Sequence, residues 1–492
     1  MSCIQKTAKE DSDEFNNVPG SVADVTAEWC EMALRTDPPN NPIINTDVSV
    51  LSIDIQNLKN EDSGAADGGG LSGSELVRII PTYAGNVTGN EPSSFVCKLS
   101  HGSGNHIAIN WRFAMYLTSG GEGYDEYMYR RETNFLKRII PIMDSALYKF
   151  PNMYFYGIED KGDRGFGSAV IMDNPVKVKS VILMEDMNGW KSSTVGTKLT
   201  KDMAILCLEN VAVLHAKLWG NHETEIKNSF KPAKTEMDFR PASHNALSKK
   251  FRKFNFRTEK IQKAINKVLN GDWKTSRTIS IDKDCLVPDW FTAEPLEDGF
   301  RPVFSDPLVL EMVGVLAVKV PHYNSQKLKN LVKKPPQTIL HGDFHGGNHM
   351  FGVNENAGKI VAFDYQWAGT GRVATEFMYF FMTSISAHSL EDVMECAEKY
   401  HQALCKNGVE DYHWDEFKED IEMMIVEMCV SFFQIFTMMK AKTLLKFADG
   451  FGEKGEALKA IFEKGMYGKF YIILTSIYLK DKENFLAVPD KM

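Results

Sequence analysis

Residues 341–366 read HGDFHGGNHMFGVNENAGKIVAFDYQ, and this stretch decides the fold that we expect. Asp343 follows a histidine by two residues, Asn348 comes five residues later, and Asp364 follows the apolar run 359–363. The apolar run predicts a short buried strand, and the asparagines and glycine before it predict a turn. Asp364 would then lie at the end of a strand and face a cleft.

These oxygen-bearing side chains suit phosphoryl transfer. That reaction needs a carboxylate that orients the attacking hydroxyl and accepts its proton, and oxygen ligands that hold magnesium on the phosphates. Asp343 suits the first role. Asn348 and Asp364 suit the second, because magnesium prefers hard oxygen donors and is usually held by one or two carboxylates plus phosphate and water. A lone HGD triplet would also fit a polar loop without chemistry, whereas H-G-D-x4-N followed by a strand ending in F-D is more specific.

Three histidines give the same stretch a second interpretation. His341, His345 and His349 recur every four residues, which on a helix would form the metal-binding face of a hydrolase. The glycines between them argue against a helix, because each costs about 1 kcal/mol in a helix interior. Bound zinc would support this alternative, and loosely held magnesium would not.

HGDFHGGN followed by VAFDYQ resembles the aminoglycoside-phosphotransferase and choline-kinase superfamily. Within it, the stretch is most similar to the ecdysteroid-kinase-like branch, also called choline-kinase-like (CHK). The resemblance implies Asp343 as the catalytic base, with His341 beside it as a structural member of the catalytic loop. It also implies ATP and Mg2+ as cofactors, with Asn348 and Asp364 as the magnesium ligands.

A glycine-rich loop lies between two segments with strand character, 48–58 and 76–80, and the first of these alternates with one slip. Gly68, Gly70 and Gly73 satisfy G-x-G-x-x-G. A dinucleotide-binding fold would need a helix next. Strand, glycine loop, strand is instead the arrangement that covers ATP phosphates in kinases. Aspartates in the loop would repel phosphate, so a flexible solvated loop stays open as an alternative.

A lysine lies among apolar residues in the expected strand 94–99. Such a lysine, Lys98, is costly to bury without a partner. The helix expected over 124–140 offers Glu132, and the resemblance implies a Lys98–Glu132 pair at the nucleotide phosphates. Two alternatives remain, namely an edge-strand lysine that points at water and Glu126 as the partner.

The run 181–184 predicts a buried strand, and EDMNG breaks it. The resemblance places the hinge between lobes here, so backbone groups near Glu185 and Met187 would bond the adenine edge. Other expected elements are a helix over 22–35 and strands over 151–158 and 168–172.

From residue 199 the apolar spacing becomes helical. The segment LHAKLW, 214–219, resembles a helix of the same family, and we expect His215 to be a core histidine with a hydrogen-bond partner. A short connection leads from the VAFDYQ motif into an aromatic helix at 377–381, which favours a small-molecule acceptor over a peptide. The family usually has aspartate where Glu376 stands, so we assign Glu376 no role.

Composition limits the alternatives. A chain of 492 residues is too long for one core, so two lobes are expected. The net charge of -9 gives no indication of nucleic-acid binding.

The eight cysteines form no C-x-x-C pair, which favours a reducing compartment, and we expect the cytoplasm. The N-terminus has no secretory signal pattern. The most apolar run, 423–439, is shorter than a membrane span.

The sequence therefore predicts an α+β, two-lobe protein-kinase-like fold. A disordered tail (1–20) would precede a small antiparallel-sheet lobe that binds nucleotide (21–185) and a larger, mainly helical lobe that binds the acceptor (186–492). The expected activity is ATP-dependent transfer of phosphate to the hydroxyl of a small molecule by a monomer. The acceptor is left open among steroid alcohols, choline-like alcohols, sugars and antibiotics. A pseudokinase that binds nucleotide or a partner without turnover is the rival reading.

Overall fold

The computed structural model groups the chain into two compact units. The N-terminal unit comprises residues 1–194 and 347–368, and the C-terminal unit comprises residues 195–346 and 369–492. The residues described are 18–36, 43–58, 74–100, 124–144, 146–160, 178–193, 199–220, 222–230, 335–384, 390–422 and 424. The expected loop glycines, Gly68, Gly70 and Gly73, lie outside them, as does the expected strand 168–172.

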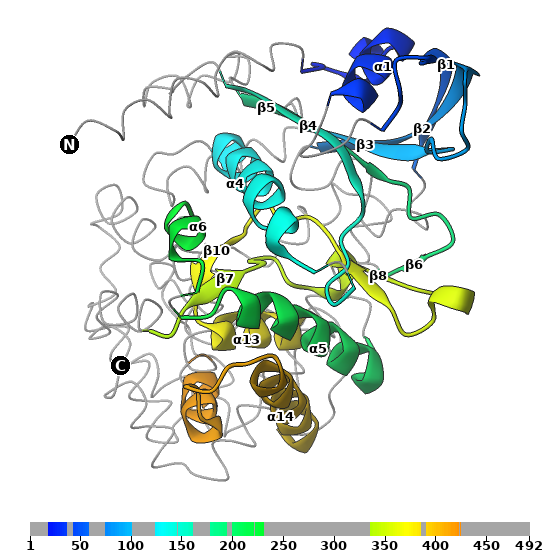
Figure 1. Cartoon of the computed structure of the whole chain (residues 1–492). Coiled ribbons are helices and arrows are strands. Elements are labelled where there is room, and N and C mark those ends of the chain that lie inside the picture. The colour runs from blue at the N-terminus through cyan, green and yellow to red at the C-terminus, as the bar shows by residue number, and fades with distance from the viewer. Residues whose placement is uncertain are drawn as a thin grey trace, which may run out of the picture. The chain divides into compact units, whose positions relative to one another are not determined.

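The N-terminal unit contains a five-stranded sheet in the order β1-β2-β3-β5-β4, in which every neighbouring pair is antiparallel (Figure 1). This confirms the small antiparallel sheet that the sequence predicts. Because β3 is the central strand, the alternative that Lys98 lies on an edge strand is wrong. The strands are β1 Val48–Asn57, β2 Ser74–Gly85, β3 Phe95–Ser100, β4 Met153–Asp160 and β5 Val178–Glu185.

The slip in the alternation of the first strand is a β-bulge. The β1–β2 register shifts between Val50 and Ser52. The extra residue, Leu51, is 64% exposed, whereas Val50 on the preceding position is buried. Side chains of a strand alternate between its two faces, so one inserted residue returns Ile53 and Ile55 to the same covered face as Val48 and Val50.

Helix α1, Ala27–Arg35, is shorter than the helix expected over 22–35. Residues Val22–Asp24 form a separate 3-10 turn, η1. The Thr26 hydroxyl accepts a hydrogen bond from the Trp29 backbone N–H at 3.1 Å, so Thr26 is the N-cap and starts the helix there. Trp29 then packs edge-on against Phe155 of β4, with ring centroids 5.8 Å apart, and joins α1 to the core of this unit.

Helix α4, Tyr124–Arg138, packs against β4 and β5 and runs into the 3-10 turn η2, Ile140–Ile142. The expected helix therefore ends two residues early. A three-stranded sheet completes the unit, with β6 Lys191–Ser192, β8 His349–Phe351 and β9 Ile360–Ala362. The β8–β9 connection contains the 3-10 turn η6, Asn354–Asn356, and Gly358 at φ 81°, as the expected turn requires.

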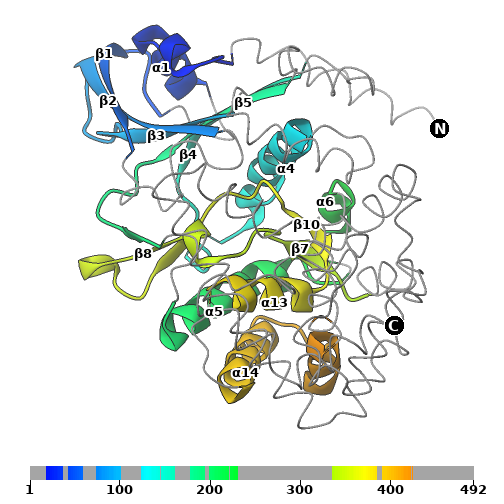
Figure 2. The same cartoon turned by 180° about the vertical axis from the view of Figure 1, so that it is seen from behind.

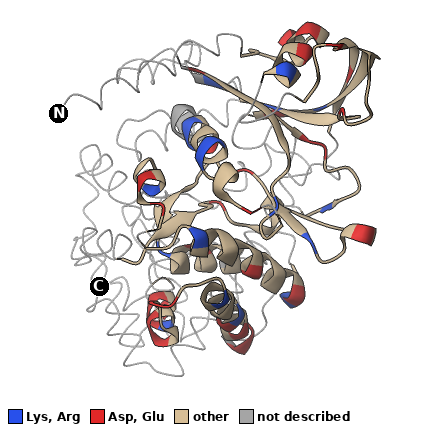
Figure 3. Ribbon diagram, in the orientation of Figure 1, with Lys and Arg blue, Asp and Glu red and all other residues tan. Residues whose placement is uncertain are grey.

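The described part of the C-terminal unit is mainly helical, which confirms the second half of the expected fold class. Helix α5 packs against α13, α14 and β7, and both views show these three helices side by side (Figures 1 and 2). Residues of both charge signs occur along α5 and α14 (Figure 3). The elements are α5 Lys201–Lys217, α6 Thr224–Asn228, β7 Thr338–Leu340, β10 Gly369–Gly371, α13 Val373–Ser384 and α14 Leu390–Lys406.

Within the described segments, no helix combines the length and the apolar character needed to cross a membrane.

Candidate active site

In the described part of the N-terminal unit, a lysine is buried between two carboxylates. The Lys98 ammonium on β3 contacts both carboxylate oxygens of Glu132, at 2.8 and 2.9 Å, and Oδ1 of Asp364 at 2.6 Å. Lys98 and Glu132 are 6% and 4% exposed, whereas the Asp364 side chain is 24% exposed. The structure thus brings together three of the residues that the sequence singled out.

Electrostatics keeps this lysine charged. Burial alone would lower the pKa of Lys98, but the carboxylates of Asp364 and Glu132 raise it above its ordinary value. Burial raises the pKa of Glu132, against the opposing effect of the lysine. A buried ion pair gains little net stability, and removing one partner leaves a costly charge. Lys98 is therefore a buried cation held between two carboxylates.

Helix α4 is attached to the segment that follows Asp364, and these contacts hold Glu132 in place. The Arg131 guanidinium donates to the Ala368 carbonyl at 2.8 Å. The ring of Phe135 stacks on Tyr365, with centroids 3.8 Å apart and planes 7° from parallel. The Tyr365 hydroxyl lies 3.0 Å from that of Tyr148. Residues close to Glu132 in the sequence are thus packed on residues close to Asp364.

The two expected magnesium ligands lie at the same end of the β8–β9 hairpin. His349 pairs with Ala362, so Asn348 just precedes β8 and Asp364 closely follows β9. The Phe363 N–H donates to the Asn348 carbonyl at 3.2 Å and extends this pairing. Asp364 has φ 69°, a left-handed conformation that aspartate adopts more readily than most residues.

The arrangement of the histidines contradicts the helical zinc-site alternative. Residues Gly346–Asn348 form only a 3-10 turn, η5, and His349 starts a β-strand. The three histidines therefore do not share a helix face, because the glycines between them break the helix. Among the described residues, no three His, Cys, Asp or Glu side chains gather into a group that could hold a metal ion.

The expected hinge follows β5. The Glu185 N–H donates to the Asn152 carbonyl at 2.7 Å, and the Met187 carbonyl accepts from the Trp190 N–H at 3.0 Å. Between them, Asp186 accepts from the Arg78 guanidinium at 2.7 and 3.2 Å and from the Ser94 hydroxyl at 2.6 Å. These bonds fix the chain as it leaves the sheet, which the sequence did not predict. The contact of Glu185 and Met187 with adenine stays a prediction.

In the C-terminal unit, Asp343 lies in a loop between β7 and η5. Its Oδ1 accepts a hydrogen bond from the Tyr379 hydroxyl at 2.8 Å, and its Oδ2 lies 3.6 Å from Nε2 of His345. Burial alone would raise the pKa of Asp343, but His345, the hydrogen bonds and His341 lower it to about 2. The Asp343 carboxylate is therefore ionised at neutral pH.

His341 supports this loop from within. Its side chain is fully buried, and its Nδ1 accepts a hydrogen bond from the Asp343 N–H at 3.3 Å. This contact fits the structural role that the resemblance implies for His341.

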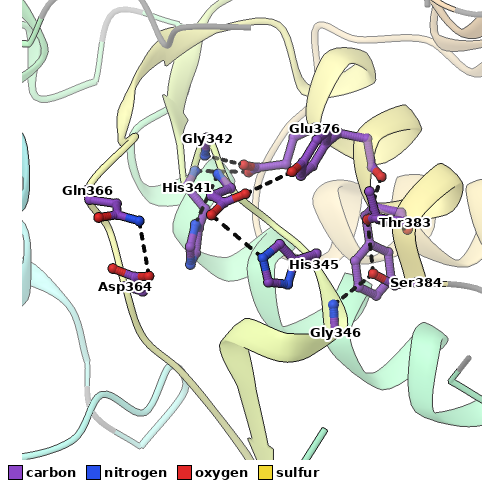
Figure 4. A network of polar contacts seen from close by, with 12 residues as sticks. His341, Gly342, His345, Gly346, Asp364, Gln366, Glu376, Thr383 and Ser384 are labelled. Carbon is purple, nitrogen blue, oxygen red and sulfur yellow. Dashed lines mark hydrogen bonds and ion pairs between the residues drawn. The ribbon is translucent and has the colours of Figure 1, made fainter. Parts of the chain in front are cut away.

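Glu376 holds the start of the loop and was not assigned a role from the sequence. Its Oε1 accepts from the Gly342 N–H at 2.7 Å, and its Oε2 accepts from the His341 N–H at 3.1 Å (Figure 4). Oε2 also lies 2.7 Å from Nε2 of His215, whose Nδ1 contacts the Tyr400 hydroxyl at 2.6 Å. The expectation that His215 is a core histidine with a partner is confirmed.

Polar residues within an aromatic helix were a sequence signal for these missed residues. Glu376, Tyr379 and Ser384 lie three and then five residues apart at the start, middle and end of α13. The Ser384 hydroxyl accepts from the Gly346 N–H at 2.7 Å. Polar residues in an otherwise aromatic helix indicate buried hydrogen-bond partners, since unpartnered polar groups are costly in a core.

The comparisons with known proteins agree with the motifs. Residues 318–410 match the model of the ecdysteroid kinase-like family. This match is less than half of the chain but includes the HGD loop, Asp364 and α13. It confirms the resemblance inferred from HGDFHGGN and VAFDYQ, and it supports a small-molecule kinase in general.

No curated protein matches the chain. Among solved structures, 28 chains match. One is the amicoumacin kinase hAmiN in complex with AMP-PNP, Ca2+ and Ami, which is 11% identical with a TM-score of 0.31 over 90% of this chain and 92% of that chain. A TM-score this low does not establish a shared fold, so the fold assignment rests on the sheet order and the contacts given above.

Proposed function

We propose that the protein is an ATP-dependent kinase that transfers phosphate to a hydroxyl group of a small molecule. The observation that carries this proposal is the Lys98 ammonium, buried between Glu132 and Asp364. Phosphate oxygens are the anions that such a cation binds in kinases, where a lysine on the corresponding strand pairs with a helix glutamate. The family match over residues 318–410 agrees with this assignment.

The donor set at the end of the β8–β9 hairpin fits magnesium. Asn348 supplies an amide oxygen and Asp364 a carboxylate, both of them hard donors. Two protein ligands suffice for magnesium in a nucleotide site, because phosphates and water complete its coordination. The Asp364 carboxylate can contact Lys98 and still bind a metal, since its two oxygens offer about four lone-pair sites. The bound ion would neutralise charge on the phosphates.

Asp343 would orient the acceptor. Its ionised carboxylate accepts a hydrogen bond from the attacking hydroxyl. The hydroxyl oxygen then forms a bond to the γ-phosphorus as the bond between the γ-phosphorus and the bridging β-phosphate oxygen breaks, and ADP leaves. With a pKa of about 2, Asp343 is a weak base at neutral pH, so it positions the hydroxyl first and takes its proton late. Asp343 precedes Asn348 by five positions in the sequence, as the H-G-D-x4-N motif requires.

The test is transfer from radiolabelled ATP, with magnesium, to a panel of a steroid alcohol, choline, a sugar and an aminoglycoside. The account predicts a phosphorylated product with at least one class of acceptor, identified by mass spectrometry. Asp343→Asn, which keeps the shape of the side chain, should slow formation of the product by about 10²–10⁴-fold while Mg-ATP still binds. Binding of Mg-ATP by the wild type without transfer or hydrolysis would favour the pseudokinase alternative.

A further inference from the structure

Helix α13 contacts the loop that carries Asp343 at three points. Glu376 holds the N–H groups of His341 and Gly342 at the start of the loop. Ser384 accepts from the Gly346 N–H at its end (Figure 4). Between these anchors, the Tyr379 hydroxyl donates to Oδ1 of Asp343 at 2.8 Å. The first and last contacts fix the backbone, and the middle one fixes a side chain.

We infer that Tyr379 is a positioning residue that sets the orientation of the Asp343 carboxylate for the acceptor hydroxyl. This inference rests on the proposed function, in which Asp343 receives that hydroxyl. Tyr379 does not need to touch the substrate, because it acts through Asp343.

The placement of Tyr379 supports this role. Its hydroxyl lies at the end of a rigid side chain with two torsions, on a helix that is tied to the loop on both sides of Asp343. The Thr383 hydroxyl donates to the Tyr379 carbonyl at 2.8 Å and also lies 3.1 Å from the Ser384 hydroxyl. The Tyr379 hydroxyl is therefore held in one place relative to the loop.

The chemistry of the contact supports it as well. A hydrogen bond to an ionised acceptor is shorter and about twice as strong as one between neutral groups. Donation from Tyr379 favours the charged form of Asp343, and it contributes to the lowered pKa of that carboxyl after the effect of His345. A carboxylate held at one oxygen cannot rotate freely, and misplacing a catalytic group by about 1 Å can cost roughly a hundredfold in rate.

The closing experiment is a double-mutant cycle on ATP hydrolysis, with Mg-ATP alone as substrate and water as acceptor. Tyr379→Phe removes only the hydroxyl and should lower kcat for ADP release roughly tenfold, part of the 10²–10⁴-fold that an acid–base group supplies. The KM for Mg-ATP should stay within about twofold. In the Asp343→Asn background, Tyr379→Phe should cause no further loss, because the two residues act as a unit.

Tyr412→Phe is the matched control, because the Tyr412 hydroxyl also bonds a carboxylate, that of Asp420, in the same unit. It should lower stability but leave kcat unchanged. Equal losses from Tyr379→Phe in both backgrounds, or an unchanged kcat, would overturn the inference.

Crystal structures of the wild type and of Tyr379→Phe separate this inference from the proposed function. The Asp343 carboxylate should leave its wild-type orientation in the variant, whether or not the protein hydrolyses ATP. A carboxylate that keeps its orientation would overturn the role of Tyr379. A wild type that releases no ADP and phosphorylates no acceptor would overturn the proposed function alone, and the two structures would then decide the role of Tyr379.

Discussion

Glu132 in the N-terminal unit and Glu376 in the C-terminal unit are equally buried, each 4% exposed, but they are engaged in different ways. Glu132 contacts one cation, Lys98, which also contacts Asp364. Glu376 accepts hydrogen bonds from two backbone N–H groups and contacts His215. The first carboxylate is part of a charge cluster, and the second is part of the scaffold of a loop.

This comparison separates a buried carboxylate that belongs to a proposed ligand site from one that stabilises the backbone. The ammonium of Lys98 has two carboxylate partners. In the proposed function it exchanges contacts when nucleotide and metal bind, so its contribution to the free energy of unfolding should depend on the ligand. Glu376 accepts hydrogen bonds from backbone donors of the loop, so its contribution to the free energy of unfolding should appear without a ligand. The predictions below separate these two effects.

The largest change in stability is expected from Glu376→Gln. The amide keeps one acceptor oxygen but turns an NH2 group toward N–H donors, so buried donors at His341 or Gly342 lose their partner. Each such group costs about 1–3 kcal/mol, and we expect a loss of about 3 kcal/mol in the free energy of unfolding, measured in urea. Glu395→Gln, an exposed partner of Lys201, is the control and should change stability by less than about 0.5 kcal/mol. Equal effects of the two variants would contradict the scaffold role.

Lys98→Met should mainly reduce the stabilisation that Mg-ATP adds to the folded protein. At a hundred times its dissociation constant, Mg-ATP should add about 2.7 kcal/mol to the wild type. The variant should lose most of this gain, since it lacks the cation that we propose contacts the phosphates. Lys359→Met, an exposed lysine of the same unit that bonds Asn356, should keep the gain in full. Thermal melting with and without Mg-ATP measures the gain in each variant. A full gain in Lys98→Met would contradict the ligand-dependent role of Lys98.

Glu132→Gln should have a smaller effect on the free protein. The amide oxygen can still accept from Lys98, and Lys98 keeps its contact with Asp364 at 2.6 Å. Burial raises the pKa of Glu132, so burial disfavours the charge that this variant removes. We expect a change within about 1 kcal/mol in urea unfolding at neutral pH. A loss as large as that of Glu376→Gln would show that both glutamates are structural.

The smallest effect concerns pH. The pKa of Asp343 is lowered to about 2 in the folded state, below an unfolded value near 3.9. Its ionisation therefore stabilises the fold above the unfolded pKa, and this contribution is lost as pH falls toward 2. By pH 3, the stability of the wild type relative to Asp343→Asn should fall by about 1 kcal/mol. Urea unfolding between pH 7 and pH 3 measures the difference, and a difference independent of pH would contradict the lowered pKa.

The sequence predicted the charge cluster better than the scaffold, for a physical reason. Lys98 lies within a strand and Asp364 just after one, where a charge beside an apolar run is conspicuous, and the helix offers few partners such as Glu132. Glu376 and Tyr379 lie in a helix, where polar residues usually face water. The polar residues of this aromatic helix indicate buried partners, but which groups they contact depends on the packing of α13 against the loop.

The same limit explains the errors in the fold. The β-bulge at Leu51 was visible as a slip in the alternation, because register is written into the apolar pattern. The start of α1 was placed five residues too early, since apolar spacing continues through Val22 and Val25 while the cap at Thr26 decides where the helix begins. Element type followed from periodicity, and element boundaries followed from individual hydrogen bonds.

The most direct test of the central claim, that the Lys98–Glu132–Asp364 cluster is a magnesium–nucleotide site, is thermal melting of the wild type and of Asp364→Ala with ATP, with and without magnesium. The account predicts that ATP raises the melting temperature of the wild type only with magnesium, and that Asp364→Ala loses this magnesium-dependent increase. An equal increase in both proteins, or no increase at millimolar Mg-ATP, would contradict it.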